Sequence, residues 1–545
     1  MRPLRYTRAA GVWMIFGTLA LMIGALLRWY QLDIQVLVDD EWHALHKVLY
    51  SDTSHILTSF GSNDYSIPLT LYYKLLATHG GLTDWVMHLP MLVCGVALMI
   101  VAPWTLRNAF SAPVRATWVA LLAISPLLIY HSRTARPYAL TCLLTFIAIF
   151  EFRRWWKSPQ PARAEGAVYV SATALAAWLH PVTLVFNLTP FLYCGVQSLV
   201  HEWRRRGPFA ASADLRRLLL LGVCVVIPVA LALGPPLLAD PGALANKAGI
   251  HSVDLESLYR TALLLFGISS PIVLIGLLAL VGWGVVLCWR SDRDLVGYLA
   301  TIFLIALFTI CAAKPIWISH PLVLARYMLP TVPLVLLFLA RGMIAAVERI
   351  GPAFIRAVFA ASAVGLLWWA GPVPGYLYFP DQFMGHYKYQ YDYDSSKNPY
   401  VTLAHPDPIP EFYRRLGNRP PASVTLIEAP WRLESNFNPH PWYQEIHRQY
   451  VKIGLVTPTC GVRTYGEYPE SSHSIRLRQF AHLSSILEGK TYGADYLVLH
   501  LHAWTIPPGA AIEWPDVAAC LPLIEQQLGA ALFSDEQIVV FRLKH

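Results

Sequence analysis

Long apolar runs recur along the first 370 residues and are separated by short polar segments. A membrane-spanning helix needs about 20 mostly apolar residues, so the sequence predicts about eleven transmembrane helices. The first run lacks a small-x-small cleavage site and is followed by similar runs, which predicts an uncleaved first helix. The run over residues 259–289 is long enough to contain a break. The predicted helices cover residues 11–28, 89–104, 116–130, 138–152, 166–180, 182–199, 215–236, 263–289, 295–313, 322–340 and 354–370.

Basic residues fall in every second connection between these helices when the N-terminus starts inside. Because Lys and Arg mark cytoplasmic connections, this pattern predicts a multi-pass inner-membrane (plasma-membrane) protein with a cytoplasmic N-terminus and an extracytoplasmic C-terminal region. The clusters are Arg2, Arg5 and Arg8; Arg107 and Arg115; Arg153, Arg154, Lys157 and Arg163; Arg204, Arg205, Arg206, Arg216 and Arg217; Arg290 and Arg293; and Arg341, Arg349 and Arg356.

The first outer loop, residues 29–88, mixes apolar and polar residues at near-helical spacing. This spacing is typical of amphipathic helices that lie on a membrane surface. After residue 371, Pro, Tyr, His and charged residues replace the apolar runs, which predicts a domain boundary. We therefore expect a helical membrane domain over residues 1–370 and an extracytoplasmic soluble domain over residues 371–545.

Short β-rich runs and helical segments alternate in the C-terminal region. SVTLIEA, DYLVLHLH and IVVFRL are typical of strands, whereas IPEFYRRLG and FAHLSSILEG favour helices. The alternation predicts a small α/β domain.

Composition supports a membrane protein. The chain of 545 residues is 55% hydrophobic and 14% charged, and its mean hydropathy of +0.44 excludes an ordinary soluble enzyme. Its net charge of +8 comes largely from the clusters that set membrane orientation, so we expect no nucleic-acid partner. Six cysteines lie in apolar segments without CxxC spacing, whereas Cys460 and Cys520 lie in the polar C-terminal region. Whether these two form a disulfide is left open.

Three acids, Asp39, Asp40 and Glu41, follow the first predicted helix. Carboxylates beside the membrane surface can act as a general base or hold a metal or a substrate hydroxyl. The alternative is a solvated helix start, since acids favour the first turn of a helix. His43 and His46 follow, so a divalent metal is possible, although no HExxH pattern is present and the sequence indicates no cofactor with certainty.

Arginines occur at the outer ends of several predicted helices. In HSRTARPYAL, Arg133 and Arg136 precede Pro137 and Tyr138. Arg holds phosphate oxygens in a bidentate fork, and it is costly to sequester at a membrane boundary unless it is paired. The alternative interpretation is that these side chains extend to lipid headgroups.

A second basic group occurs in LARYMLPTVP, where Arg326 and Tyr327 follow Lys314 and His320. The predicted topology places these residues on the same side as the acids and the first arginine pair. His180 ends another predicted helix at this level, where an interfacial role is the alternative to a functional one. Acids and cations on one side of a helix bundle suit a phosphorylated donor and a hydroxyl nucleophile.

At these residues the chain resembles the C superfamily of glycosyltransferases, in particular bacterial relatives (families 39 and 83) of protein O-mannosyltransferases, aminoarabinose transferases and rhizobial lipopolysaccharide-core galacturonosyltransferases. The resemblance covers roughly residues 10–370. It rests on the acidic pair Asp40-Glu41, the turn from Ser132 to Tyr138, the His180 corner, and the run from Arg326 to Pro333.

The resemblance implies a polyprenyl-phosphate sugar as donor and an inverting displacement at its anomeric carbon. It makes Asp40 the candidate base and Glu41 its neighbour, with Asp39 leaving the register ambiguous by one residue. Arg133, Arg136 and Arg326 become candidate phosphate ligands, and this cluster could replace a metal. Besides membrane lipid, the expected partner is an acceptor that could be a protein, lipid A, a glycan or another lipid.

Other functions remain as alternatives. A transporter or flippase of lipid-linked saccharides would also need cations facing an anionic lipid, but transporters commonly show repeats and mid-membrane charges, which this sequence lacks. An O-antigen polymerase or ligase predicts a large outer loop between late helices. A binding protein with a degenerate membrane anchor would not need Asp40 or the arginines.

Overall fold

The computed structural model describes residues 3–30, 32, 37, 41–61, 65–79, 81–158, 163–206, 213–250, 252–268, 270–348, 350–370, 405–430, 439–461, 481–501 and 516–543. They belong to two compact units. The bundle unit comprises residues 1–33 and 43–393, and the sheet unit comprises residues 34–42 and 394–545. Residues 371–404 lie outside the described residues, so the domain boundary at 371 stays a prediction.

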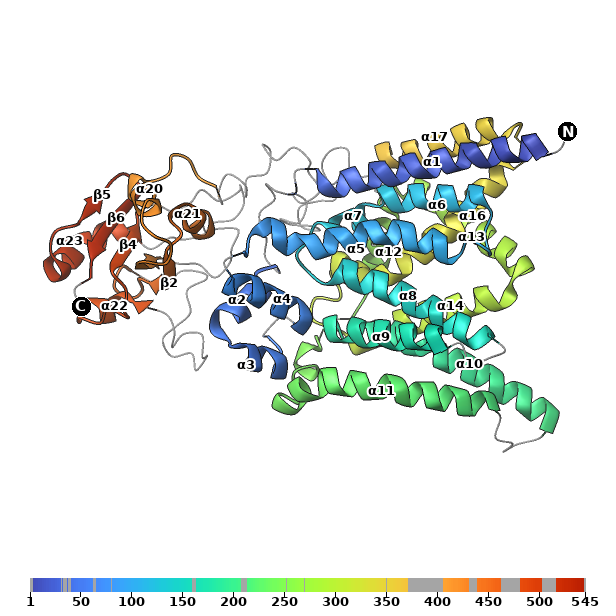
Figure 1. The fold of residues 1–545 in the computed structure, drawn as a ribbon, viewed down its shortest axis with the longest axis horizontal. Coiled ribbons are helices and arrows are strands. Elements are labelled where there is room, and N and C mark those ends of the chain that lie inside the picture. The colour runs from blue at the N-terminus through green and yellow to red at the C-terminus, as the bar shows by residue number, and fades with distance from the viewer. Residues whose placement is uncertain are drawn as a thin grey trace. The chain divides into compact units, whose positions relative to one another are not determined.

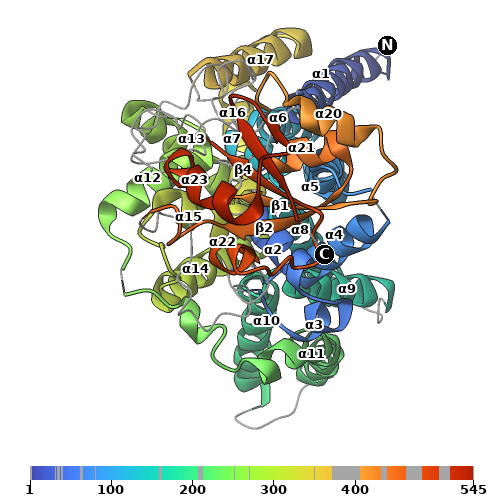
Figure 2. The same cartoon turned by 90° about the vertical axis from the view of Figure 1, so that its left-hand side faces the viewer.

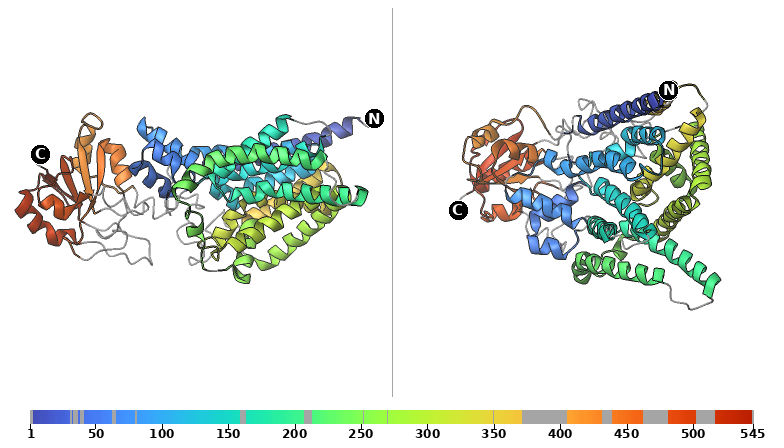
Figure 3. Two further views of the ribbon diagram at one scale, coloured as in Figure 1. Left: turned by 90° about the horizontal axis from the view of Figure 1, so that it is seen from below. Right: turned by 45° about the vertical axis from the view of Figure 1, so that its right-hand side comes forward.

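Every predicted transmembrane segment is helical in the bundle unit (Figure 1). The helices run over α1 (Pro3–Trp29), α5 (Asp84–Thr105), α6 (Ala112–Ile124), α7 (Pro126–Ser132), α8 (Tyr138–Lys157), α9 (Arg163–Leu179), α10 (Thr183–Arg206), α11 (Ala213–Ala239), α12 (Leu255–Phe266), α13 (Pro271–Ser291), α14 (Arg293–Ala313), α15 (Pro321–Tyr327), η3 (Leu329–Thr331), α16 (Val332–Val347) and α17 (Ala353–Ala370). A short η2 (Ala245–Lys247) lies between α11 and α12. Figure 3 shows α8, α9, α10 and α11 running side by side.

Two predicted helices are broken at prolines. The segment 116–130 consists of α6 and α7, which meet at an angle of 60°. Pro126 has no N–H to donate to the carbonyl of Leu122 four residues earlier, so the helix cannot continue with regular hydrogen bonds. The break predicted within residues 259–289 is confirmed, because α12 ends at Phe266 and α13 begins at Pro271.

The described residues contain seven helices that are long and apolar enough to cross a membrane, or eight if α6 and α7 form one span. The prediction of a multi-pass membrane protein is therefore confirmed, but the predicted count of about eleven transmembrane helices is not. Part of the shortfall lies in α17, whose apolar part, Ala353–Trp369, is at the short end of the range for a full span.

Close helix contacts in the bundle depend on small residues. A Cβ added to Gly284 of α13 would lie 1.9 Å from the carbonyl oxygen of Phe338 in α16. Reciprocally, a Cβ on Gly342 of α16 would lie 2.0 Å from the carbonyl oxygen of Leu280 in α13. Between membrane helices there is little hydrophobic driving force, so such backbone approach supplies van der Waals packing instead.

The first outer loop forms the helices that its spacing predicts: α2 (Trp42–Tyr50), α3 (Thr53–Thr58) and α4 (Ile67–Thr78). Ala44, Leu45 and Val48 of α2 are buried, which confirms the amphipathic character of this segment. The three helices lie at the end of the bundle where α1 ends and α5 begins (Figure 1).

The sheet unit is an α/β fold, as predicted. Its strands are β1 (Thr425–Ala429), β2 (Tyr450–Leu455), β3 (Ala481–His482), β4 (Tyr496–His500), β5 (Phe533–Ser534) and β6 (Ile538–Arg542), in the order β3-β2-β1-β4-β6-β5. The first four strands are mutually parallel, with Leu426 opposite Val451 and Tyr496, whereas β6 runs antiparallel to β4. Sequence reasoning identified β1, β4 and β6 but not β2, β3 or β5.

Helices cover both faces of this sheet (Figure 2). On one face, α20 (Glu411–Gly417) and α21 (His440–His447) bury Tyr413 and Tyr443 against Leu426 and Val498. On the other face, α22 (Leu483–Leu487) and α23 (Val517–Leu528) pack against the alternate residues Ile427 and Leu497. The alternation along each strand therefore builds two apolar layers.

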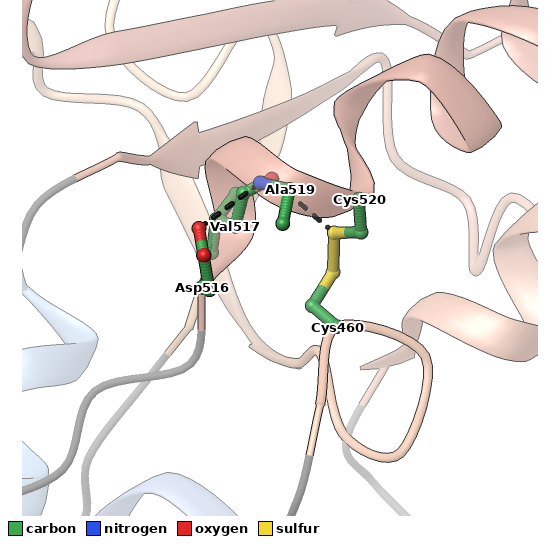
Figure 4. The surroundings of a disulfide bond; sticks show 5 residues. All are labelled: Cys460, Asp516, Val517, Ala519 and Cys520. Atoms are coloured by element: carbon green, nitrogen blue, oxygen red, sulfur yellow. Dashed lines mark hydrogen bonds between the residues drawn. A yellow bond between two sulfur atoms is a disulfide. The ribbon is translucent and has the colours of Figure 1, made fainter.

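A disulfide joins Cys460 to Cys520 at the start of α23, with a Cα–Cα distance of 5.3 Å (Figure 4). The Asp516 side chain caps the same helix by accepting a 3.0 Å hydrogen bond from the backbone N–H of Ala519. The covalent link ties α23 to the segment that follows β2.

Candidate functional site

The segments predicted to lie outside the membrane pack against one another at one end of the bundle. Tyr73 of α4 donates a hydrogen bond to the carbonyl of Ala135 at 3.3 Å, and Tyr65 donates to the carbonyl of Ala243 at 2.8 Å. The backbone N–H of Ile316 donates to the carbonyl of Lys247 at 2.8 Å. These bonds join the first outer loop, the arginine turn, the loop before α12 and the segment after α14.

Three of these segments bring aromatic rings and an arginine together. The ring centroids of Tyr138 and His180 are 5.6 Å apart, and those of His180 and Tyr327 are 5.8 Å apart. The guanidinium carbon of Arg326 lies 5.6 Å from the ring centroids of both Tyr138 and Tyr327. We call these four residues, together with Arg136, the aromatic–arginine cluster.

Arg136 belongs to this cluster through the turn that precedes α8. Its backbone N–H donates to the carbonyl of Thr134 at 2.7 Å, and Pro137 follows with a φ of −69°, the angle that proline fixes. The Arg136 side chain is buried, and His180 lies within electrostatic range of both Arg136 and Arg326. The imidazole of His180 therefore lies in the electrostatic field of two guanidinium groups.

Arg133 points to a different part of the bundle. Its Nη1 donates to the carbonyl oxygens of Tyr30 at 2.6 Å and Arg28 at 3.4 Å, at the end of α1. The last carbonyls of a helix have no intrahelical donor, so a buried guanidinium stabilises them. Arg133 thus holds the end of α1, and its predicted contact with phosphate stays a prediction.

Arg28, which lies near the same end of α1, donates hydrogen bonds to backbone carbonyls at the break between α6 and α7. Its guanidinium donates to the carbonyls of Ala123 at 3.1 Å and Leu122 at 3.0 Å, and its Nε donates to Ser132 at 3.2 Å. Leu122 is the residue whose carbonyl Pro126 cannot satisfy. The bond to Ser132 shows that this interaction also fixes the residue immediately before Arg133.

Of the three predicted acids, the structure describes only Glu41. Asp39 and Asp40 lie outside the described residues, and Glu41 directly precedes α2 and is buried. The role of all three stays a prediction. Lys314 follows α14 with a left-handed φ of 45°, and its side chain is exposed, unlike Arg136.

Two histidines near the cluster, His131 and His320, occur in the motifs above but are not among the predicted site residues. His131 is buried, its ring centroid lies 5.0 Å from that of Tyr138, and within the described residues neither ring nitrogen has a hydrogen-bond partner. His320 caps α15, and burial together with the positive charge of Arg326 lowers its pKa. No spacing rule could have identified them, because their significance comes from their proximity to Arg326.

The aromatic–arginine cluster suits an anionic ligand. Guanidinium groups present fixed forks of N–H donors that match phosphate oxygens, and they stack on aromatic rings. Low-dielectric surroundings strengthen the attraction between these cations and a phosphate. Since Tyr138 and Tyr327 flank Arg326, the rings also restrict where its guanidinium can lie.

A metal site built on Asp39 or Asp40 with His43 and His46 stays a prediction, since both aspartates and the His46 side chain lie outside the described residues. Among the residues that the structure describes, the group arranged to hold a metal ion is Glu428, His440 and His500 of the sheet unit. Sequence reasoning did not select this group.

No protein-family model and no curated protein sequence matches the chain. Similarity is found to solved structures. ArnT from Cupriavidus metallidurans bound to undecaprenyl phosphate is 13% identical, with a TM-score of 0.56 over 97% of this chain and 98% of that protein. Its apo form gives 14% identity and the same TM-score. The Archaeoglobus fulgidus oligosaccharyltransferase gives 12% identity and a TM-score of 0.44 over 90% of this chain and 69% of that one. From its likeness to both ArnT structures, the chain has the fold of ArnT.

Proposed function

We propose that this protein transfers a sugar from a polyprenyl-phosphate carrier to an acceptor. The observation that supports the proposal best is the convergence of Arg136, Tyr138, His180, Arg326 and Tyr327 from three separate segments. The fold agrees with this function, because ArnT, which shares it along nearly the whole chain, was solved with undecaprenyl phosphate bound.

The chemistry follows from the residues. In the proposed reaction, a carboxylate, Asp40 first among the three acids, removes the proton of an acceptor hydroxyl. The hydroxyl oxygen then attacks the anomeric carbon, and the bond from that carbon to the phosphate oxygen breaks, so polyprenyl phosphate leaves with the electron pair. Arg136 and Arg326 stabilise the charge that develops on the leaving phosphate. Attack from the side opposite the phosphate inverts the anomeric configuration.

We further propose that the reaction takes place on the extracytoplasmic side of the inner membrane, with the N-terminus in the cytoplasm. The alternation of basic clusters supports this orientation. The disulfide between Cys460 and Cys520 supports it independently, since disulfides persist in oxidising compartments. In this topology residues 371–545 form a domain outside the cytoplasm.

The test is mass spectrometry of lipids incubated with purified full-length protein and membranes that contain polyprenyl-phosphate sugars. We expect wild type to convert the glycosylated carrier to bare polyprenyl phosphate, whereas Asp40→Asn binds the carrier without converting it. Equal turnover by both proteins would move the base to Asp39 or Glu41.

A matched arginine control separates the site from general charge effects. Arg341 lies on α16 and forms an ion pair with Glu348 at 3.0 Å, within a predicted cytoplasmic cluster. Arg341→Ala should therefore keep carrier turnover, whereas Arg326→Ala should not. Binding of the carrier without turnover by wild type would favour transport of lipid-linked saccharides, and absence of any carrier binding would refute both.

A further inference from the structure

Three ionisable side chains meet inside the sheet unit, far in sequence from the motifs above. The Glu428 carboxylate Oε2 lies 2.7 Å from His500 Nε2 and 3.7 Å from His440 Nδ1. One ligand atom from each residue lies within 4.8 Å of the other two. The exposed fractions of Glu428, His440 and His500 are 1%, 1% and 3%, so all three are removed from solvent.

The sheet topology explains why they meet. Glu428 and His500 lie toward the carboxyl ends of β1 and β4, and Glu428 is directly opposite Val498 in the parallel register, two residues before His500. The chain proceeds from β1 to β2 and β3 on one side and then returns to place β4 on the other side of β1. Ligands of open α/β sheets bind outside the carboxyl ends of the strands at such a reversal. His440 is the first residue of α21, which covers this face.

A buried carboxylate needs a compensating positive charge, because desolvation of an isolated ion costs several kcal/mol. A protonated imidazole or a metal ion could supply it. An imidazole binds a metal ion through the lone pair of a ring nitrogen, and His440 and His500 each offer one nitrogen to the group. Two imidazoles and one carboxylate are a common ligand set for zinc.

We propose that Glu428, His440 and His500 bind a divalent transition-metal ion of the zinc type. Tetrahedral ligands about 2.0–2.2 Å from zinc are roughly 3.4 Å from one another. The separations of 2.7 and 3.7 Å fall on either side of that value, and all three ligand atoms lie within 4.8 Å of one another, so small side-chain shifts bring them to it.

Tyr413 supports the carboxylate from α20. Its hydroxyl donates a 2.8 Å hydrogen bond to Glu428 Oε2 and lies 3.4 Å from His500 Nε2. Partners of this kind orient metal ligands, and their loss typically lowers metal affinity by about 10–100-fold. Tyr413 is buried on the same face, so it can hold Glu428 in place before the metal binds.

This inference is independent of the transferase proposal, and its test measures metal rather than activity. Full-length protein is stripped with a chelator, dialysed and titrated with ZnCl₂, and bound zinc is counted by mass spectrometry. We expect about one equivalent in wild type with tetrahedral coordination, read from the visible d–d band after Co²⁺ substitution. His440→Gln and His500→Gln should lose the band, and Tyr413→Phe should weaken zinc affinity by roughly 10–100-fold.

His447→Gln is the matched control, because His447 is a buried histidine of the same helix but not of the metal-binding group. It should keep the zinc equivalent and the d–d band. Glu428→Gln preserves the shape of the side chain but removes its negative charge. We expect this variant to lose zinc while its near-ultraviolet circular dichroism stays unchanged, which would show that the loss does not come from misfolding. Absence of zinc uptake by wild type, or equal uptake by Glu428→Gln and wild type, would overturn the proposal.

Discussion

The guanidinium of Arg326 lies over the ring of Tyr138, with 5.6 Å between the guanidinium carbon and the ring centroid. Arg326 lies in the last turn of the short helix α15, late in the bundle, whereas Tyr138 begins α8 directly after the arginine turn. Their contact joins two of the four motifs on which the resemblance to C-superfamily glycosyltransferases rests. It also gives the arginine a fixed position before any phosphate arrives, which reduces the entropy lost on binding.

Replacing Arg326 should therefore impair donor turnover in a graded manner. Arg326→Ala removes the charge, and we expect a loss of roughly 10²–10³-fold, as for other groups that stabilise developing anionic charge. Arg326→Lys retains a point charge but loses the planar fork and the stacking, so its loss should be intermediate. Conversion of glycosylated carrier to bare polyprenyl phosphate measures both variants. Equal rates for Arg326→Ala and Arg341→Ala would contradict the assignment.

Arg133 should behave as a stabilising residue. Arg133→Met removes hydrogen bonds from a buried charged residue to the end of α1, and hydrogen bonds to charged groups are worth about 1.5–3 kcal/mol each. We expect a clear fall in the thermal unfolding temperature of the detergent-solubilised protein. Arg154→Met is the control, since exposed Arg154 donates to the carbonyl of Thr105 at another helix end and should contribute little.

The Arg133 variant also tests the role predicted from the sequence. If Arg133→Met unfolds at the wild-type temperature but no longer binds the carrier, the phosphate contact is its main function. If stability falls and carrier binding per folded molecule is retained, the contact with Tyr30 is its main function.

The sequence predicted the positions of the bundle helices well because the length of an apolar run is set directly by membrane thickness. It did not predict the break at Pro126, because residues 116–130 form one continuous apolar run and proline is tolerated in membrane helices. In the structure, Arg28 satisfies the carbonyls of Leu122 and Ala123 at this break.

The sequence could predict candidate site residues only by showing which of them lie on the same side of the membrane. Placing Arg136, His180 and Arg326 on one side led to the expectation of a shared site, and the structure brings these three together. The same argument could not separate Arg133 from Arg136, because a spacing of three residues does not reveal which side chain meets the end of α1. Glu428 and His500 escaped notice because each lies in a strand whose pairing is invisible in the sequence.

The α13–α16 contact predicts a position-specific effect of small substitutions. Gly284→Ala would place a methyl group 1.9 Å from the carbonyl oxygen of Phe338, so the two helices must separate. We expect a lower unfolding temperature in detergent. Gly282→Ala in the same helix is the control, since a Cβ there meets no atom within 4 Å and should be tolerated. Comparable losses for both variants would show that helix flexibility, and not contact, makes glycine necessary.

The disulfide yields a prediction about the sheet unit alone. Cys460 and Cys520 are separated by 60 residues, and in the chain-entropy model a closed loop of this size stabilises the folded state by about 4 kcal/mol. The double variant Cys460→Ser and Cys520→Ser should therefore expose the sheet unit to proteolysis at a lower temperature than wild type. The bundle should be unaffected, because none of its described helices contains either residue.

Treatment with a reducing agent should reproduce this effect in wild type and leave the double variant unchanged, which separates loss of the bond from loss of the sulfur atoms in the core. Limited proteolysis followed by mass spectrometry identifies which unit is cleaved first. If reduction leaves the temperature of cleavage unchanged, the apolar core that contains Cys460 and Cys520, and not the covalent bond, holds this region.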